Sequence, residues 1–238
     1  DSVRLLLYGQ SGTGKTTCWS SFPDPILALV CSGGRKPGEL RSINTPENGE
    51  RRTPRIVTAT DQLKSLLEDE APSYATVVLD HVSGLEDLVL KQLLGLEELP
   101  AQRTWGLASQ QQYGQCAQQC KEYLRAMLNL PGNVVIVGQE RVFKGKDDGT
   151  ADEVIRRTVG VGVMPSLAGW LMPACDYVVQ TFKRQNTSTE TRVVNGREVT
   201  TERRERGIGY CLRTGPHDTY CTKFRVPKGR PLPEYVTL

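Results

Sequence analysis

Apolar stretches and amphipathic segments alternate along the first three quarters of this chain. The stretches that indicate buried strands lie at 3–7, 26–30, 76–80, 134–137 and 177–181, with a short one at 55–57. Between them, apolar residues recur at helical spacing and predict helices at 16–21, 63–67, 85–94 and 105–130. Thr60 or Asp61 is expected to cap the second of these helices. This alternation predicts an α/β fold, a mostly parallel sheet flanked by helices on both faces.

The last quarter of the chain has a different pattern. Asn195-Gly196 fits a two-residue type I′ turn between apolar residues and predicts a β-hairpin. Further strands are predicted at 208–213 and 220–226, so we expect C-terminal antiparallel hairpins to extend the sheet. The glycine-rich, charged segment 140–165 predicts a loop with at most one short helix. We expect one domain over 1–238, with a core at about 1–182 and a hairpin extension at about 183–238.

Composition narrows the class of protein only slightly. The 238 residues are 38% hydrophobic, which suffices for a core, and the formal net charge of +3 names no partner. No stretch approaches the roughly 20 apolar residues that cross a bilayer. The chain enters its first strand at once, without a signal peptide, so we expect a cytoplasmic protein. Because the sequence starts at Asp1 rather than Met, we expect the native chain to extend upstream.

The cysteines give little support to a metal site. There are seven of them, no C-x-x-C occurs, and only two histidines accompany them. Reduced thiols in a cytoplasmic protein are therefore expected. Cys116 and Cys120 are one helical turn apart, so we expect them to share a helix face.

A phosphate-binding motif follows the first predicted strand directly. Residues 9–16 spell G-x-x-x-x-G-K-T, in which glycines let backbone N–H groups point into a phosphate and the lysine reaches the β- and γ-phosphates. The helix that begins there adds its positive N-terminal end. The alternative is a glycine-rich turn that only caps a helix. The residues expected to bind nucleotide are Gly9, Gln10, Ser11, Gly12, Thr13, Gly14, Lys15, Thr16 and Thr17.

Polar residues at the ends of two later strands complete this picture. Asp80 ends a buried strand, at the place where an acid holds Mg²⁺ in P-loop NTPases. The Thr16 hydroxyl is the other expected Mg²⁺ ligand. Gln139 ends the next strand, where an amide contacts the γ-phosphate or its attacking water. Each has a plain alternative: Asp80 as a turn cap, and Gln139 as an ordinary polar strand end.

The order of these features resembles the RecA/KaiC core of P-loop ATPases. The shared elements are the P-loop, a strand followed by Gly33-Gly34, the strand ending in Asp80, a long helix, and a strand ending Val-Gly-Gln at Gln139. The Pro-Gly-Asn-Val-Val-Ile-Val phrase at 131–137 and the short length are most similar to phage RecA-core-only ATPases that act in single-strand annealing and recombination. The resemblance covers roughly 3–226 and implies a RecA-like core, ATP and Mg²⁺ as cofactors, and a bacterial host if the chain is phage-encoded.

The resemblance also implies roles for two sets of basic residues. Lys223 and Arg225 match a Lys-x-Arg pair that RecA/KaiC rings insert into the neighbouring subunit's nucleotide site, although a solvated basic edge strand is the alternative. The loop after Gln139 corresponds to the DNA-binding loop of RecA-like proteins, and acidic residues there offset part of its charge. Its candidate DNA-binding residues are Arg141, Lys144, Lys146, Arg156 and Arg157.

One departure from the family bears on catalysis. RecA and KaiC relatives usually carry a catalytic Glu just after the second strand, where this chain has Cys31-Ser32. Glu39 and Glu140 are the candidate replacements, with Glu86 as a further one. We therefore expect an ATPase whose hydrolysis is slow or uses a displaced carboxylate.

The function expected from these features is ATP-dependent binding of single-stranded DNA, with annealing or recombination by a homo-oligomeric ring or filament that holds ATP at subunit interfaces. One alternative is a P-loop NTPase without a recombination role, such as a packaging motor, a helicase loader or a small-molecule kinase. The other is a nucleotide-gated assembly protein that does not catalyse hydrolysis.

Overall fold

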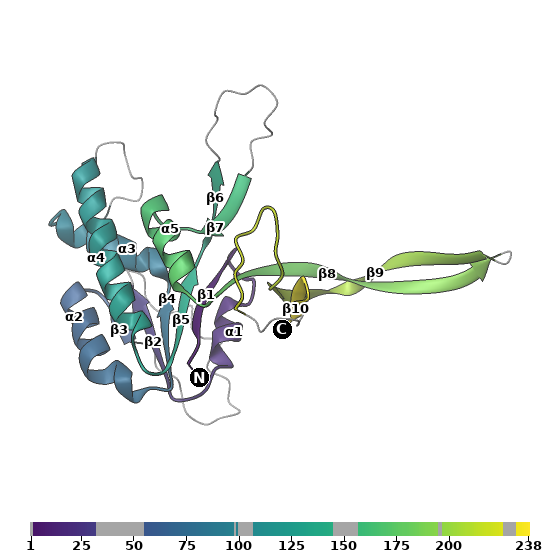
Figure 1. Cartoon of the computed structure of the whole chain (residues 1–238), viewed down its shortest axis with the longest axis horizontal. Coiled ribbons are helices and arrows are strands. Elements are labelled where there is room, and N and C mark those ends of the chain that lie inside the picture. The colour runs from purple at the N-terminus through teal and green to yellow at the C-terminus, as the bar shows by residue number, and fades with distance from the viewer. Residues whose placement is uncertain are drawn as a thin grey trace, which may run out of the picture.

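The structure is a computed structural model. It describes residues 2–31, 55–97, 99, 107–144, 157–194, 197–225 and 232–238. An eight-stranded sheet forms its centre, in the order β10-β9-β8-β1-β5-β4-β2-β3 (Figure 1). Five adjacent strands form the middle of the sheet: β1 (Arg4–Gly9), β2 (Ile26–Cys31), β4 (Thr76–Asp80), β5 (Asn133–Gly138) and β8 (Tyr177–Val194). The remaining strands are β9 (Arg197–Arg213) and the two edge strands, β3 (Arg55–Val57) and β10 (Tyr235–Thr237).

Parallel and antiparallel pairings divide this sheet into two parts. The strands from β8 through β1, β5, β4 and β2 to β3 pair in parallel, whereas β9 and β10 add to β8 as antiparallel strands. The predicted fold class is therefore confirmed: a mostly parallel sheet flanked by helices, with C-terminal antiparallel strands. Strand β5 lies between β1 and β4, so the strand that leads into the P-loop and the strand that ends in Asp80 are not direct neighbours.

Helices cover both faces of the sheet, unequally. One face packs on α1 (Lys15–Ser20), where fully buried Trp19 contacts Leu5, Leu7 and Val179 in one apolar cluster. The other face carries the larger cluster, beneath α2 (Thr60–Ser65), α3 (Val82–Leu93), α4 (Gln110–Leu128) and α5 (Pro165–Ala174). Alternation along each buried strand supplies both clusters, because successive side chains point to opposite faces.

Helix starts differ from the prediction where local capping decides them. A capping box fixes α4 at Gln110, because the Ser109 hydroxyl accepts the Gln112 N–H and the Gln112 side chain accepts the Ser109 N–H. The predicted start at 105 is therefore wrong. Neither Thr60 nor Asp61 caps α2, which has Ala59 at that position and continues through a π-helical turn, η3 (Leu66–Glu70), into the 3₁₀ turn η4 (Ala71–Ser73).

The segment predicted as a loop at 140–165 contains regular structure instead. Strands β6 (Glu140–Lys144) and β7 (Arg157–Val161) pair antiparallel as a separate two-stranded sheet, which projects beyond the ends of the parallel strands in Figure 1. Helix α5 was not predicted. Pro165 stands in its first turn, where proline is tolerated, whereas Pro173 lies inside the helix and argues against one. Side chains distant in sequence form hydrogen bonds with the backbone groups at both ends of α5. Glu86 Oε1 accepts the Met164 N–H at 2.7 Å, and Lys223 Nζ donates to the Pro173 and Cys175 carbonyls.

The predicted hairpin is confirmed and is longer than expected. Strands β8 and β9 pair from Gln180↔Arg213 out to Val194↔Arg197, with one irregularity between Gln185 and Thr187. Figure 1 shows the pair as a two-stranded ribbon extending away from the body of the molecule. The strand predicted at 220–226 is wrong for its described part, which forms only isolated bridges at Tyr220 and Lys223.

The cysteines are placed in the described part of the chain, and two of them share a helix face as predicted. None of the seven cysteines, all of which lie in the described residues, forms a disulfide, and Cys116 and Cys120 lie buried on one face of α4. In the described residues, no cluster of three His, Cys, Asp or Glu side chains is placed to hold a metal ion. The described helices include none with the length and apolar character of a membrane span.

Candidate nucleotide-binding site

The P-loop joins β1 to α1, and its backbone requires glycine at two positions. A side chain on Gly9 would overlap the Thr181 side chain and carbonyl on the neighbouring strand β8. Gly14 takes φ 90° at the N-cap of α1, a left-handed conformation that L side chains rarely adopt. Between them, Thr13 Oγ1 lies 2.5 Å from Thr181 Oγ1 and 2.8 Å from the Gln10 carbonyl, so β8 fixes the loop from one side.

Lys15 is held across the mouth of this loop. Its ammonium donates to the Gly9 carbonyl at 2.8 Å and to the Gln10 carbonyl at 2.6 Å. Burial lowers the pKa of Lys15 below its usual value of 10.5, and the charges of Asp80 and Glu140 oppose that shift. Both acids therefore lie within electrostatic reach of the ammonium.

The residues expected to hold Mg²⁺ occupy suitable elements. Thr16 is in the first turn of α1, and Asp80 is the last residue of β4. A hydroxyl and a carboxylate are the hard oxygen ligands that Mg²⁺ prefers, so the donor set fits the ion. The next residue, His81, caps α3 instead of facing a ligand, because its Nδ1 accepts the Gly84 N–H at 3.1 Å and lies 2.6 Å from the Ser83 hydroxyl.

Glu140 is tied directly to the P-loop. Its Oε1 accepts the Gln10 side-chain amide at 2.7 Å, and its Oε2 accepts the Gln180 amide of β8 at 3.3 Å. As the first residue of β6, Glu140 follows Gln139, which follows the end of β5. Of the candidate catalytic carboxylates, Glu140 is thus beside the P-loop, Glu86 is buried in α3 as a cap for α5, and Glu39 lies outside the described residues.

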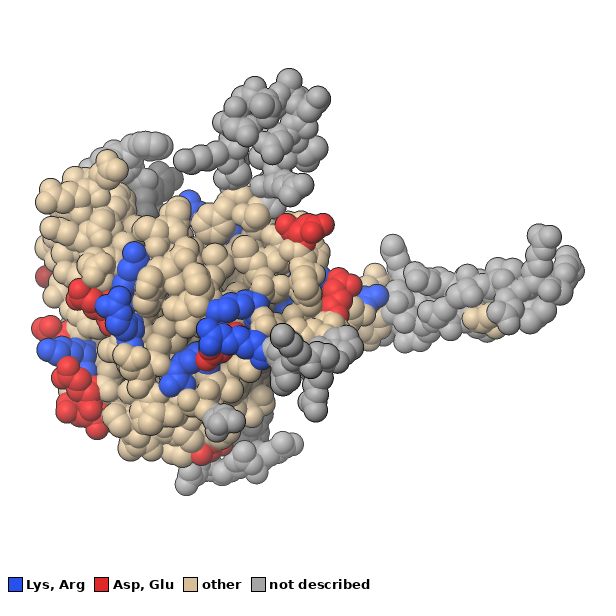
Figure 2. All heavy atoms as spheres, viewed as in Figure 1, with Lys and Arg blue, Asp and Glu red and all other residues tan. Residues whose placement is uncertain are grey.

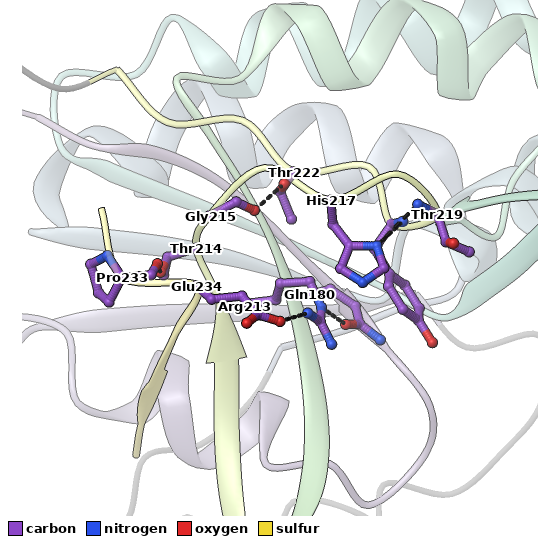
Figure 3. Close-up of polar contacts among 10 residues, drawn as sticks. Gln180, Arg213, Thr214, Gly215, His217, Thr219, Thr222, Pro233 and Glu234 are labelled. Atoms are coloured by element: carbon purple, nitrogen blue, oxygen red, sulfur yellow. Dashed lines mark hydrogen bonds and ion pairs between the residues drawn. The ribbon is translucent and has the colours of Figure 1, made fainter. Parts of the chain in front are cut away.

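A buried arginine extends this network behind Glu140. Arg213 Nε donates to Gln180 Oε1 at 3.1 Å, and Arg213 Nη1 pairs with Glu234 at 2.9 Å (Figure 3). The guanidinium lies over the rings of Phe182 and Tyr220, 4.6 and 4.8 Å from their centroids. The path from Gln10 through Glu140 and Gln180 to Arg213 connects the P-loop to the C-terminal strands.

Sequence reasoning missed Gln180 and Arg213. The one available signal was a polar residue inside the apolar run at 177–181, since buried polar side chains need a partner. The partner itself is set by the β8–β9 register, which pairs Gln180 with Arg213 and is not readable from spacing.

The two predicted trans cations lie together, away from the P-loop of their own chain. Lys223 forms an isolated bridge with Val178, in the part of β8 opposite Leu6, while its ammonium caps the end of α5. Arg225 pairs with Asp176 at 2.9 Å. Both therefore reach the segment that enters β8, whereas the P-loop contacts Thr181 further along the strand.

The candidate DNA-binding residues belong to the β6/β7 sheet as far as they are described. Arg141 is exposed, and its guanidinium lies 5.8 Å from the centroid of the Phe143 ring. Lys144 ends β6 and Arg157 begins β7, opposite each other in the register. Lys146 and Arg156 lie outside the described residues.

Comparisons with known proteins give a family match and a similar solved structure. A family model described as an AAA domain matches residues 1–226. Among solved structures, the flagellar accessory protein FlaH from Methanocaldococcus jannaschii is similar, with a TM-score of 0.41 and 9% sequence identity, over 99% of this chain and 85% of that chain. No curated protein matches the chain.

Proposed function

We propose, from the premise that this chain belongs to the AAA domain family, that it hydrolyses ATP and binds single-stranded DNA to promote annealing or recombination. The observation that carries the ATPase part is the placement of Lys15. Its ammonium bridges two P-loop carbonyls within reach of Asp80 and Glu140. A bound polyphosphate replaces those carbonyls as the partner of the ammonium, with its γ end toward the two acids.

Each residue then has one task in phosphoryl transfer. Lys15 offsets negative charge on the β- and γ-phosphates, and Thr16 and Asp80 would hold Mg²⁺, which neutralises phosphate charge when bound. Glu140 is the proposed general base, oriented by the amides of Gln10 and Gln180. The water oxygen bonds to the γ-phosphorus, its proton passes to a Glu140 oxygen, and the bond to the ADP oxygen breaks.

The β6/β7 sheet is the proposed contact for single-stranded DNA. It begins at Glu140, immediately beside the P-loop, and carries exposed Arg141 next to Phe143. Figure 2 shows Lys, Arg, Asp and Glu intermixed on the described surface of that view. The proposed binding therefore relies on local phosphate contacts and weakens with salt. Lys223 and Arg225 are proposed to complete the nucleotide site of a neighbouring chain in a ring or filament.

Two variants test the ATPase proposal. Lys15→Ala should abolish ATP binding, because it removes the cation that the loop holds. Glu140→Gln should keep ATP binding and slow hydrolysis about 100-fold, the usual contribution of a general base. Glu122→Gln, on the exposed side of α4, is the matched control and should change neither. Calorimetric ATP titration and phosphate release measure the two effects.

The outcomes separate the competing functions. Unchanged hydrolysis in Glu140→Gln would reject Glu140 as the base and direct the test to Glu39→Ala. A wild type that binds ATP without releasing phosphate would instead support a nucleotide-gated assembly protein.

Fluorescence anisotropy with labelled single-stranded DNA tests the other half of the proposal. ATP should strengthen binding at low salt, and Arg141→Ala with Lys144→Ala should weaken it and reduce its salt dependence. Lys64→Ala on α2 is the control. Absence of DNA binding at low salt would contradict the DNA proposal and favour a P-loop NTPase of the packaging-motor or helicase-loader kind.

A further inference from the structure

Three residues form a row across the C-terminal strands, on the face of the sheet that carries α1. Lys183 of β8 is the register partner of Tyr210 of β9, and the Leu238 N–H donates to the Tyr210 carbonyl at 2.8 Å. Side chains two apart on a strand share a face. Lys183 therefore shares its face with Val179, and Tyr210 shares its face with Leu212, both of which pack in the α1 cluster.

This row lies directly against the P-loop. A Cβ placed on Gly12 would be 3.5 Å from Lys183 Nζ. A Cβ on Gly14 would be 3.5 Å from Tyr210 Cδ1 and 3.2 Å from Leu238 Cδ1. Gly14 is the N-cap of α1, so the aromatic ring stands at the point where the loop becomes the helix.

The same face is unusually apolar for an exposed surface. The described residues include six exposed large hydrophobic side chains, and four of them are on β9 and β10 or beside them: Ile208, Tyr210, Val236 and Leu238. Tyr210 is 43% exposed and Leu238 is 49% exposed. Exposed apolar side chains grouped beside a binding loop indicate a ligand contact.

The direction of the phosphate chain says which part of a nucleotide meets this row. Lys15 reaches the β- and γ-phosphates, and Asp80 at the end of β4 marks that end. In the sheet, the acid strand β4 is on one side of β1, whereas β8, β9 and β10 are on the other. The α-phosphate and its nucleoside therefore leave the loop toward Tyr210.

We infer that Lys183 and Tyr210 form a nucleoside subsite of the P-loop, in which the base stacks on the Tyr210 ring beside Leu238. Lys183, whose ammonium is 5.9 Å from the centroid of that ring, contacts the phosphate chain at its nucleoside end. This inference rests on the proposed ATP binding. Because every base presents a π-face, the subsite accepts ATP and GTP with similar affinity.

Competition titrations with ATP and inorganic tripolyphosphate test the inference. Tyr210→Ala should weaken ATP binding about tenfold or more, the usual effect of losing one base–aromatic stack, and leave tripolyphosphate affinity unchanged. Tyr210→Trp should restore ATP affinity, because it restores a ring. Lys183→Ala should weaken both ligands, and Leu96→Ala, which trims an exposed apolar residue at the end of α3, should affect neither.

The ligand pair separates the failure of this inference from failure of the ATPase proposal. If wild type binds neither ATP nor tripolyphosphate, the proposed function itself fails. If wild type binds both and Tyr210→Ala lowers neither affinity, the P-loop stands and the nucleoside subsite is overturned. A Tyr210→Ala protein that loses both ligands equally also overturns it, because the change then acts on the loop rather than on the base.

Discussion

Lys15 shows how one side chain links burial to ligand binding. In the free protein, burial lowers its pKa below 10.5, so the ammonium loses its proton at a lower pH than an exposed lysine does. A bound polyphosphate places negative charge beside it and raises that pKa again. The charged form is therefore favoured in the complex, and affinity falls as pH rises through the pKa of the free protein.

Proton uptake is the direct measure of this coupling. ATP binding should take up a fraction of a proton at alkaline pH below 10.5, because the complex holds the Lys15 proton more tightly than the free protein does, and that uptake should shrink as the pH falls below the pKa of the free protein. Calorimetry in two buffers of different ionisation enthalpy gives the number of protons. Lys15→Arg removes the titration, so uptake that persists in that variant would contradict the assignment to Lys15.

The cysteines should differ in reactivity in a way that follows their burial. Burial raises the pKa of Cys31 and of Cys175 to about 12, so the reactive thiolate is about a thousand-fold scarcer than for a thiol with the ordinary value of 9.0. Cys221 is partly exposed, whereas the other six are buried. Iodoacetamide should therefore modify Cys221 first in the native protein and all seven only after denaturation, as peptide mass spectrometry will show.

At the scale of elements, Arg213 holds together strands that are distant in sequence. Its buried guanidinium bonds Gln180 of β8 and Glu234 near β10 and packs between two rings. Arg213→Ala should lower the free energy of unfolding by about 2 kcal/mol, because it removes that packing and leaves Gln180 without its donor. Urea denaturation measures the change.

The exposed partner is the matched control for Arg213. The Glu234 side chain is 64% exposed, so Glu234→Gln should lower the free energy of unfolding by less than about 1 kcal/mol. An equal decrease in the free energy of unfolding for the two variants would show that the ion pair, rather than the burial of Arg213, stabilises the strands.

The elements that the sequence predicted are those whose stabilising contacts are local or repeated. Buried strands and α1–α4 follow from apolar periodicity, and the hairpin follows from Asn195-Gly196. Helix α5 has prolines at both ends and depends on Glu86 and Lys223, which are far away in sequence. The extension of β8 beyond Thr181 lacks a continuous apolar pattern, so the sequence did not predict its length.

The same distinction applies to the site. The P-loop is a sequence motif and Asp80 is the end of an apolar strand, so both could be predicted from the sequence. The structure places Asp80 within electrostatic reach of Lys15. Glu140 was one of several candidate carboxylates, and only the fold shows that Gln10 and Gln180 hold it beside the loop. Tyr210 and Lys183 carry no motif at all, and the strand register brings them to Gly12 and Gly14.

At the scale of the whole molecule, the site of one chain is proposed to need a second chain. Lys223 and Arg225 contact the segment that enters β8 rather than their own P-loop. Lys15→Ala and Lys223→Ala proteins should each lack ATPase activity, and mixing them should restore it at about a quarter of the sites, where both residues are intact. Phosphate release measures the recovery, with mass photometry reporting the size of the assembly.

Lys223→Ala also removes a cap from α5, so its stability needs its own check. Loss of that cap should cost up to about 1 kcal/mol, too little to unfold the chain. Absence of any recovery on mixing, with both proteins folded and assembled, would rule out the shared site.

The continuity of β8 gives the molecule a mechanical property. A single strand, with one pairing irregularity between Gln185 and Thr187, runs from Thr181, which contacts the P-loop, to Val194 at the far end of the ribbon. At roughly 3.3 Å per residue, those 13 steps make a lever about 40 Å long. A rotation of about 5° where β8 meets the P-loop moves the tip by roughly 3–4 Å at that spacing. The ribbon would therefore convert any small change of strand angle beside the phosphate site into a larger displacement at its tip.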